Sequence, residues 1–299
     1  MNTKETIETD GVVTEDDIQV KMQNIRDEMK KYNNRDSETK YIAMLSGGQD
    51  STAMTLRLLE LGKPVDYIIF SDTGLEHDEM YEYLDKLDAF FQRKYNKKII
   101  RLYPKNSFEH WTFGKNTKGD NIGMIRGTPR VSLPCFWRRE AKEYPLIRWL
   151  KEKGIKDFIK YVGCTSTETE RATNMGLYNY EAPLIEWGWT EQDVQTYLKE
   201  NQMENKLYQH FLRTGCAVCP KQRIDDKYMV WKHYRKHWDY MVDVENRLEI
   251  ARKENNEKHY PAWHDKLFCY EMEELFKKKE KQTTFEFDFE VVQDCFCKI

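Results

Sequence analysis

The chain has 299 residues, of which 39% are hydrophobic and 33% charged, with a formal net charge of -3. This composition is that of a globular protein with a charged surface and excludes disorder throughout the chain. No apolar run approaches the roughly 20 residues that a membrane-spanning helix needs, and the polar, acidic residues 1–10 are unlike a secretory signal. We therefore expect a cytoplasmic protein without a membrane partner.

The predicted elements alternate between helices and strands up to about residue 190. Residues 14–32 form a predicted amphipathic helix whose apolar side chains share one stripe: Ile18, Met22, Ile25 and Met29. The predicted strands are 41–45, 65–70, 98–102 and 157–162, and the predicted helices between them are 52–61, 78–95 and 139–153. This alternation indicates an α/β fold, with a parallel sheet covered by helices on both faces.

The pattern after residue 190 is mainly helical. Residues 191–201 and much of 221–281 have helical periodicity, and the aromatic residues at 285, 287 and 289 alternate with acids as in an edge strand. Trp231, Tyr234 and Trp238 recur at about one helical turn, which favours a place in the core over a base-stacking surface.

The strand at 41–45 runs directly into Ser46-Gly47-Gly48-Gln49-Asp50-Ser51, and a predicted helix follows. Two glycines let the backbone bend tightly and approach a ligand closely. The helix presents unpaired N–H groups and the positive end of its dipole, which together form an anion site. The Gly-Lys-Ser/Thr ending of a Walker loop is absent. We therefore predict a loop that binds nucleotide phosphates without ordinary γ-phosphoryl transfer.

Further motifs accompany this loop. Residues 70–76 read FSDTGLE, residues 163–171 read GCTSTETER, and the stretches 183–187, 193–194, 207–208 and 213–220 follow. In this order they resemble the phosphoadenosine phosphosulfate (PAPS) reductase family of the PP-loop ATP pyrophosphatase superfamily, with Thr169 where the family has Ser. The resemblance covers about residues 38–222 and implies adenine-nucleotide binding and a five-stranded sheet in the order 3-2-1-4-5.

The resemblance also implies roles for individual residues. The implied nucleotide-binding residues are Ser46, Gly47, Gly48, Gln49, Asp50, Ser51, Asp72 and Gly163. Glu168 and Arg171 would face the phosphates and, with Asp50, are the candidate catalytic residues. Arg171 offers a planar fork for phosphate or sulfate oxygens that Glu168 orients, although an ordinary surface ion pair has the same spacing.

We divide the chain accordingly into three parts. Residues 1–36 are an N-terminal tail with the amphipathic helix, 37–222 are the PP-loop nucleotide-binding domain, and 223–299 are a charged, mainly helical extension.

Three of the seven cysteines match a metal-binding pattern. Cys216 and Cys219 form a Cys-x-x-Cys motif, and Cys135 lies 81 residues upstream. In the iron–sulfur branch of the family a Cys-Cys pair stands at this upstream position, whereas Phe136 replaces its second cysteine here. The resemblance therefore implies an iron–sulfur cluster on Cys135, Cys216 and Cys219. Zinc with His210 as a further ligand and buried inert thiols are the alternatives, and the candidates for a fourth ligand are Cys164, Cys269, Cys295 and Cys297.

The charge is spread unevenly. Between Arg93 and Lys160 there are 18 Lys/Arg and 6 Asp/Glu, a net charge of +12. A basic segment in an acidic protein indicates a local anionic ligand, with a solvated basic face as the plain alternative. Several of these cations surround Cys135 in sequence and are expected to lower the pKa of its thiol: Arg126, Arg130, Arg138, Arg139 and Lys142.

Two chemistries of the family share the loop. In one, ATP with Mg²⁺ adenylates a substrate, pyrophosphate leaves, and sulfur displaces the activated oxygen. In the other, PAPS or its analogue APS is reduced with release of sulfite, but the sequence lacks the reductases' Glu-Cys-Gly-x-His motif. We favour the first chemistry, with a sulfur donor protein as partner, a nucleic acid as a candidate acceptor and a homo-oligomeric state. A non-catalytic nucleotide sensor or scaffold subunit is the remaining hypothesis.

Overall fold

The computed structural model describes residues 39–168 and 179–281. The predicted helix at 14–32, the edge strand at 285–289, Arg171, Cys295 and Cys297 lie outside these ranges. Within them, none of the helices combines the length and the apolar character needed to cross a bilayer.

Five parallel strands form the central sheet in the order β3-β2-β1-β4-β5, as the resemblance implied. The strands are β1 (Lys40–Met44), β2 (Tyr67–Ser71), β3 (Ile99–Leu102), β4 (Phe158–Tyr161) and β5 (Tyr180–Glu181). In the register of the central strand, Ala43 of β1 pairs with Ile68 of β2 on one side and Tyr161 of β4 on the other. The predicted parallel sheet is confirmed, and four of its strands lie within two residues of their predicted limits.

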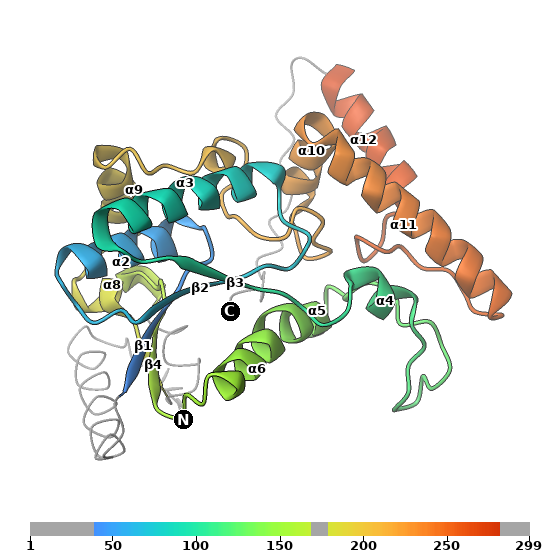
Figure 1. Ribbon diagram of the computed structural model, residues 1–299. Coiled ribbons are helices and arrows are strands. Elements are labelled where there is room, and N and C mark those ends of the chain that lie inside the picture. Colours follow the sequence, from blue (N-terminus) through green and yellow to red (C-terminus); the bar gives the residue numbers. More distant parts are fainter. Residues whose placement is uncertain (1–38, 169–178, 282–299) are drawn as a thin grey trace, which may run out of the picture.

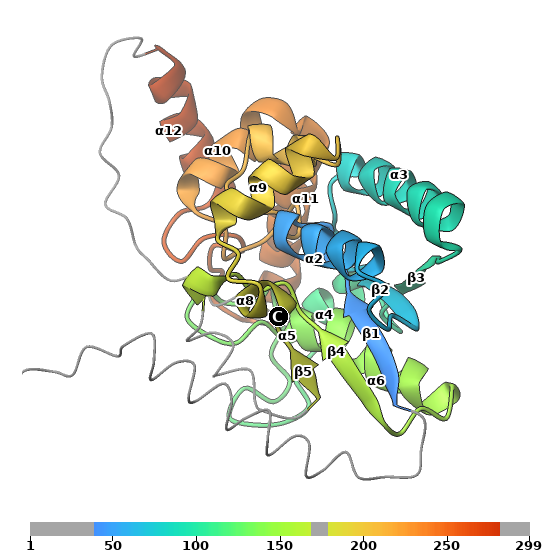
Figure 2. The same cartoon turned by 90° about the vertical axis from the view of Figure 1, so that its left-hand side faces the viewer.

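Helices cover both faces of the sheet (Figures 1 and 2). One face is covered by α2 (Gln49–Glu60), α3 (Asp78–Tyr95), α8 (Pro183–Glu186) and α9 (Glu191–Glu200). The other face is covered by α6 (Tyr144–Glu152). The apolar side of α6 packs against β1, β2 and β3 in one cluster: Leu146, Trp149, Leu150, Ile42, Ile69 and Leu102.

The single helix predicted at 139–153 is divided in the structure. It consists of α5 (Phe136–Arg138), a π-helical turn over Arg139–Glu143, and α6. Pro145 near the start of α6 explains the division, because it has no N–H to donate to the carbonyl four residues earlier. The wider π turn absorbs this interruption.

The C-terminal extension contains α10 (Ile224–His233), α11 (Arg235–Glu254) and α12 (Cys269–Lys281), which group on one side of the molecule beyond α3 and α4 (Phe108–Phe113) (Figure 1). Trp238 on α11 is fully buried, as its spacing predicted, and its ring lies 5.6 Å from that of Phe276 on α12. The buried residues of the extension belong to the same hydrophobic cluster as those of α2 and α3. The sheet and the extension therefore share one core.

Imidazole and aromatic rings form the junction between α3 and the extension. His77, at the N-cap of α3, is 3% exposed, and its ring centroid lies 4.5 Å from Tyr234 and 5.0 Å from His237. His210 stacks on His233 at 4.2 Å, and its Nδ1 is 2.9 Å from the Tyr234 hydroxyl. This packing brings four histidines together at one interface.

The histidine junction makes stability depend on pH. Burial, and then the neighbouring His237, lower the pKa of His77 to about 3, and burial also lowers the pKa of His233 and His237. These imidazoles bind protons more tightly in the unfolded chain than in the folded protein. Their contribution to the free energy of unfolding is therefore complete above about pH 6.5 and is lost as the pH falls towards 3. We expect His77→Phe to flatten the decline in unfolding free energy between pH 7.5 and 5 by up to about 1.4 kcal/mol per pH unit, measured by urea unfolding. Equal slopes for His77→Phe and the wild type would show that His77 does not titrate in this way.

Candidate nucleotide-binding site

The loop from Ser46 to Ser51 joins β1 to α2 at the carboxyl end of the central strand. Gly47 has a φ of 75°, and a Cβ atom there would lie 2.3 Å from the Sδ atom of Met80 on α3. Gly48 is the N-cap of α2, with an extended backbone. The bend therefore delivers the chain directly into the first turn of α2, where the amide groups have no acceptor within the helix.

The two serines of the loop hydrogen-bond to each other. Their Oγ atoms are 2.9 Å apart, and the Ser46 amide donates to Ser51 Oγ at 3.0 Å. Ser51 Oγ also lies within donating distance of the Gly48 carbonyl, at 3.2 Å. The serines thus stabilise the bend itself, while their predicted contact with phosphate stays a prediction.

A distant segment of the chain supports the loop from outside. Asn205 Nδ2 donates to the Gly47 carbonyl at 3.0 Å, and the Gln49 amide donates to the Tyr208 hydroxyl at 3.0 Å. Tyr208 belongs to one of the sequence motifs but had no predicted role, and Asn205 was not predicted as a site residue. The sequence could have indicated Asn205 only as an N-cap residue. It precedes the 3-10 turn Lys206–Gln209 and caps it by accepting a hydrogen bond from the Leu207 amide.

Gly163, in the segment after β4, lies against the start of α2. A Cβ atom there would be 2.5 Å from the Ser51 amide nitrogen and 2.8 Å from the Asp50 carbonyl carbon. The structure thus brings Gly163 together with the loop. Glu168 ends the 3-10 turn Ser166–Glu168, and Arg171 lies outside the described residues, so the catalytic role of this pair stays a prediction.

Asp72 follows β2 and is 5% exposed. Its Oδ1 atom accepts from the Gly74 amide at 2.8 Å and from the Tyr81 hydroxyl at 2.9 Å. These bonds give Asp72 a clear role in shaping the loop after β2, and its predicted nucleotide contact stays untested.

A chain of polar contacts leads from this loop to Cys216. Thr73 Oγ1 donates to Glu76 Oε1 at 2.7 Å, and the Cys216 thiol donates to Thr73 Oγ1 at 3.5 Å. Burial raises the pKa of Glu76. Burial and then Glu76 raise the pKa of Cys216 to about 12, with a smaller contribution from Cys135. At neutral pH the Cys216 thiol is therefore protonated, because burial outweighs the opposing effect of Lys142.

The loop that carries Cys216 and Cys219 is held by two residues that follow it. Gln222 Nε2 donates to the Cys216 and Ala217 carbonyls, each at 3.3 Å, and its Oε1 accepts from the Cys219 amide at 3.4 Å. The fully buried Lys227 donates through Nζ to the Pro220 carbonyl at 3.2 Å and to that of Gln222. The conformation of the Cys-x-x-Cys segment is thus fixed from both sides.

The predicted metal ligands do not assemble into a metal site in this conformation. Among residues 39–168 and 179–281, no three Cys, His, Asp or Glu side chains are gathered as ligands. His210 is engaged with Tyr234 and His233, and Cys164 and Cys269 are buried. Thiols are the usual ligands of iron–sulfur clusters and of zinc, but these side chains are not arranged to hold either one. The metal cluster therefore stays a prediction, and the proposed reaction does not depend on it.

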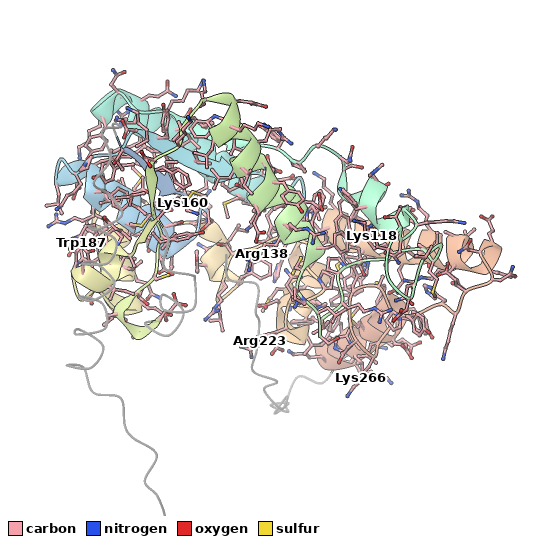
Figure 3. The ribbon with its side chains drawn as sticks, turned by 90° about the horizontal axis from the view of Figure 1, so that it is seen from below. Lys118, Arg138, Lys160, Trp187, Arg223 and Lys266 are labelled. Atoms are coloured by element: carbon pink, nitrogen blue, oxygen red, sulfur yellow. The ribbon has the colours of Figure 1, made fainter. Side chains whose placement is uncertain are left out.

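Several cations of the basic segment serve structural contacts. Arg126 lies over the Trp111 ring at 4.6 Å, and Arg138 pairs with Glu143 through two nitrogens, at 2.9 and 2.7 Å. Figure 3 shows Arg138 where the sheet half of the molecule meets the C-terminal helices. Part of the predicted basic surface is therefore used for contacts within the protein itself.

The strand order and the diglycine loop between β1 and α2 define a PP-loop type of nucleotide-binding fold. Residues 40–122 match the family model of the phosphoadenosine phosphosulfate reductase domain. This match agrees with the family resemblance of the motifs.

Two relatives share longer stretches. An uncharacterized protein of Methanocaldococcus jannaschii is 30% identical over 221 residues, which cover 70% of this chain and 42% of that protein. The chain therefore spans less than half the length of that relative. An uncharacterized 37.8 kDa protein of Escherichia phage 186 is 24% identical over 271 residues, covering 75% of this chain and 80% of the phage protein.

Two solved structures are similar to the chain at low identity. A PAPS reductase from Candida auris in a phosphate complex has a TM-score of 0.40 at 17% identity, covering 67% of this chain and 93% of that one. The U34-tRNA thiolase from Methanococcus maripaludis with its 4Fe-4S cluster has a TM-score of 0.35 at 14% identity, covering 92% and 84%.

The bend at Gly47 can be tested against a matched glycine. Gly47→Ala places a methyl group at positive φ and against Met80, whereas Gly62→Ala, at the other end of α2, has a φ of 62° and no atom within 4 Å of the new Cβ. Both variants carry backbone strain of about 1 kcal/mol, but only Gly47→Ala displaces the loop. We expect Gly47→Ala to weaken ATP binding at least tenfold in calorimetry and Gly62→Ala to leave it unchanged. Equal affinity in both variants would contradict the assignment of the loop.

Proposed function

We propose that the chain is an ATP pyrophosphatase-type enzyme that adenylates an acceptor and couples this step to sulfur transfer. The observation that supports the proposal is the bend at Gly47 and Gly48, which opens on the N-terminus of α2 and which Gly163 approaches without a side chain. Such a site favours a polyphosphate, because the helix dipole and the first-turn amides both attract negative charge.

In the first step an acceptor oxygen attacks the α-phosphorus of ATP, and the bond to the β-phosphate oxygen breaks. The amides of the α2 first turn stabilise the charge that develops on the leaving pyrophosphate. Asp50 would hold the Mg²⁺ that accompanies ATP, which supplies further charge neutralisation. In this scheme Arg171 binds phosphate oxygens and Glu168 orients it.

In the second step a sulfur nucleophile displaces AMP from the activated acceptor. Cys216 is the candidate sulfur carrier, because its thiol donates to Thr73, which donates to Glu76. The thiol has to lose a proton before it reacts, since the thiolate is the nucleophile. The buried Glu76, whose pKa is raised, is a proton acceptor of increased strength, and Thr73 connects the two groups.

The partners in this scheme are proposals of the same kind. A sulfur donor protein that carries a persulfide would transfer its outer sulfur to the Cys216 thiolate and leave as a thiolate. After the Cys216 persulfide has displaced AMP, a second thiol would reduce the Cys216–acceptor disulfide and release the thiolated acceptor. A nucleic acid is a candidate acceptor because of the basic segment between Arg93 and Lys160. We propose residues 37–222 as the nucleotide-binding part, residues 223–299 as an extension of it, and a homo-oligomeric enzyme.

A second candidate function is reduction of a sulfonucleotide. It is favoured by the match of residues 40–122 to the PAPS reductase domain. In that reaction a thiol attacks the sulfate sulfur of PAPS and sulfite is finally released.

One product assay separates these functions. With ATP and Mg²⁺ we expect release of pyrophosphate, because the loop stabilises it as a leaving group, and we expect Gly47→Ala to reduce the rate at least tenfold. Release of sulfite from PAPS with a thiol donor, without pyrophosphate from ATP, would support the reductase instead. Binding of ATP with neither product would indicate a nucleotide sensor. Gly62→Ala is the control, since it carries the same backbone strain outside the site.

A further inference from the structure

A pocket of about 660 Å³ lies between the carboxyl ends of β2 and β3 and the helix α11. Its walls come from the loop after β2, the starts of α3 and α4, α5, the cysteine loop and α11. The extension contributes Lys236, His237 and Tyr240. The volume suits a nucleoside-sized ligand, since small-molecule pockets enclose roughly 300–1,000 Å³.

The pocket walls are rich in aromatic rings. They include Tyr81 of α3, Phe108 of α4, Trp137 of α5 and Tyr240 of α11. Aromatic walls favour a flat ring, which stacks on them.

The charges at the pocket disfavour a phosphate group. Its acidic lining residues are Glu76, Asp78 and Glu109, of which Glu109 is paired with Arg247 at 2.8 Å. Its basic lining residues are Lys236 and His237, and burial lowers the pKa of His237. Lys236 Nζ already contacts both carboxylate oxygens of Asp78, at 2.8 and 2.9 Å. A bound anion would therefore lie near carboxyl groups, and Lys236 is not free to pair with it. An uncharged heterocycle does not have this unfavourable electrostatic energy.

The pocket also adjoins the candidate sulfur carrier. Thr73 lines it and accepts the hydrogen bond from the Cys216 thiol, and Val218 of the same cysteine loop forms part of its wall. None of the phosphate-loop residues 46–51 lines it. A ring bound here therefore lies next to the thiol and outside the site of the nucleotide phosphates.

We propose that this pocket binds an uncharged nucleobase of the molecule that accepts sulfur, and that Tyr240 of the extension is one of its stacking residues. The proposal rests on the proposed sulfur-transfer function and adds the chemical class of the acceptor. The base has two sources, a free nucleoside or a residue within a nucleic acid strand.

Photo-crosslinking of the wild-type full chain tests the location of the base. The probes are 4-thiouridine and 8-azidoadenosine, which carry no phosphate, and a single-stranded pentanucleotide with a central 4-thiouridine. We expect crosslinked peptides that contain Tyr81, Phe108, Trp137 or Tyr240. Crosslinks found only in peptides outside the pocket walls, or no crosslink with any probe, would overturn the proposal.

Calorimetry with the same unmodified ligands tests the role of Tyr240. We expect Tyr240→Ala to weaken base binding at least tenfold and Tyr240→Phe less than threefold, since the ring provides the stacking surface. The control is Tyr270→Ala on α12, where the side chain is 64% exposed and outside the pocket. Unchanged base affinity in a Tyr240→Ala protein that still binds ATP would overturn the proposal.

Affinity measurements distinguish the two sources of the base, a nucleoside and a nucleic acid, and the two sites, the pocket and the phosphate loop. A pentanucleotide that binds at least tenfold more tightly than uridine assigns the base to a nucleic acid, and equal affinity assigns it to a nucleoside. Gly47→Ala should weaken ATP binding at least tenfold and leave nucleoside binding intact. Loss of both in a folded Gly47→Ala protein would place the base with the ATP site and overturn the proposal, whereas a failure of pyrophosphate release alone concerns only the phosphate loop.

Discussion

Three segments meet at the start of α2, and their close approach is the constraint on which the site depends. Gly47 turns beneath Met80, Gly163 lies against the Ser51 amide, and the Tyr208 hydroxyl accepts from the Gln49 amide. Two of these contacts leave no room for a side chain, because a Cβ atom at Gly47 or Gly163 would overlap its neighbour. The sheet order follows the same need, since β4 must lie beside β1 for Gly163 to reach the loop.

The sequence predicted those elements of the fold that are determined by the pattern of apolar residues within a short stretch of the chain. Apolar runs identified four strands, and the apolar periodicity of residues 78–95 identified α3 with both ends. It did not identify β5, whose two residues are too few for a pattern, or the short helices α4 and α8. The helix predicted at 139–153 is present, but periodicity did not identify the π turn at Arg139–Glu143, which accompanies Pro145.

The same distinction applies to the site. The glycines of the tight bend could be predicted from the sequence, because a diglycine between a predicted strand and a predicted helix indicates a phosphate-binding turn. Asn205 could not be found in this way, because its bond to the Gly47 carbonyl joins residues 158 positions apart. The environment of the Cys216 thiol could not be predicted from the sequence either. Its pKa rises because burial and Glu76 act more strongly than Lys142, and burial is a property of the folded chain alone.

The extension is structurally continuous with the sheet domain rather than a separate addition to it. Its core is continuous with that of α2 and α3, and the histidine junction joins its helices to the start of α3. That start directly follows Thr73 and Glu76, which contact each other and Cys216. Any movement of α11 relative to α3 therefore changes both a wall of the pocket and the surroundings of the thiol. A protein that lacked the extension would lose Lys227, whose ammonium group donates to the Pro220 and Gln222 carbonyls, and with it one support of the cysteine loop.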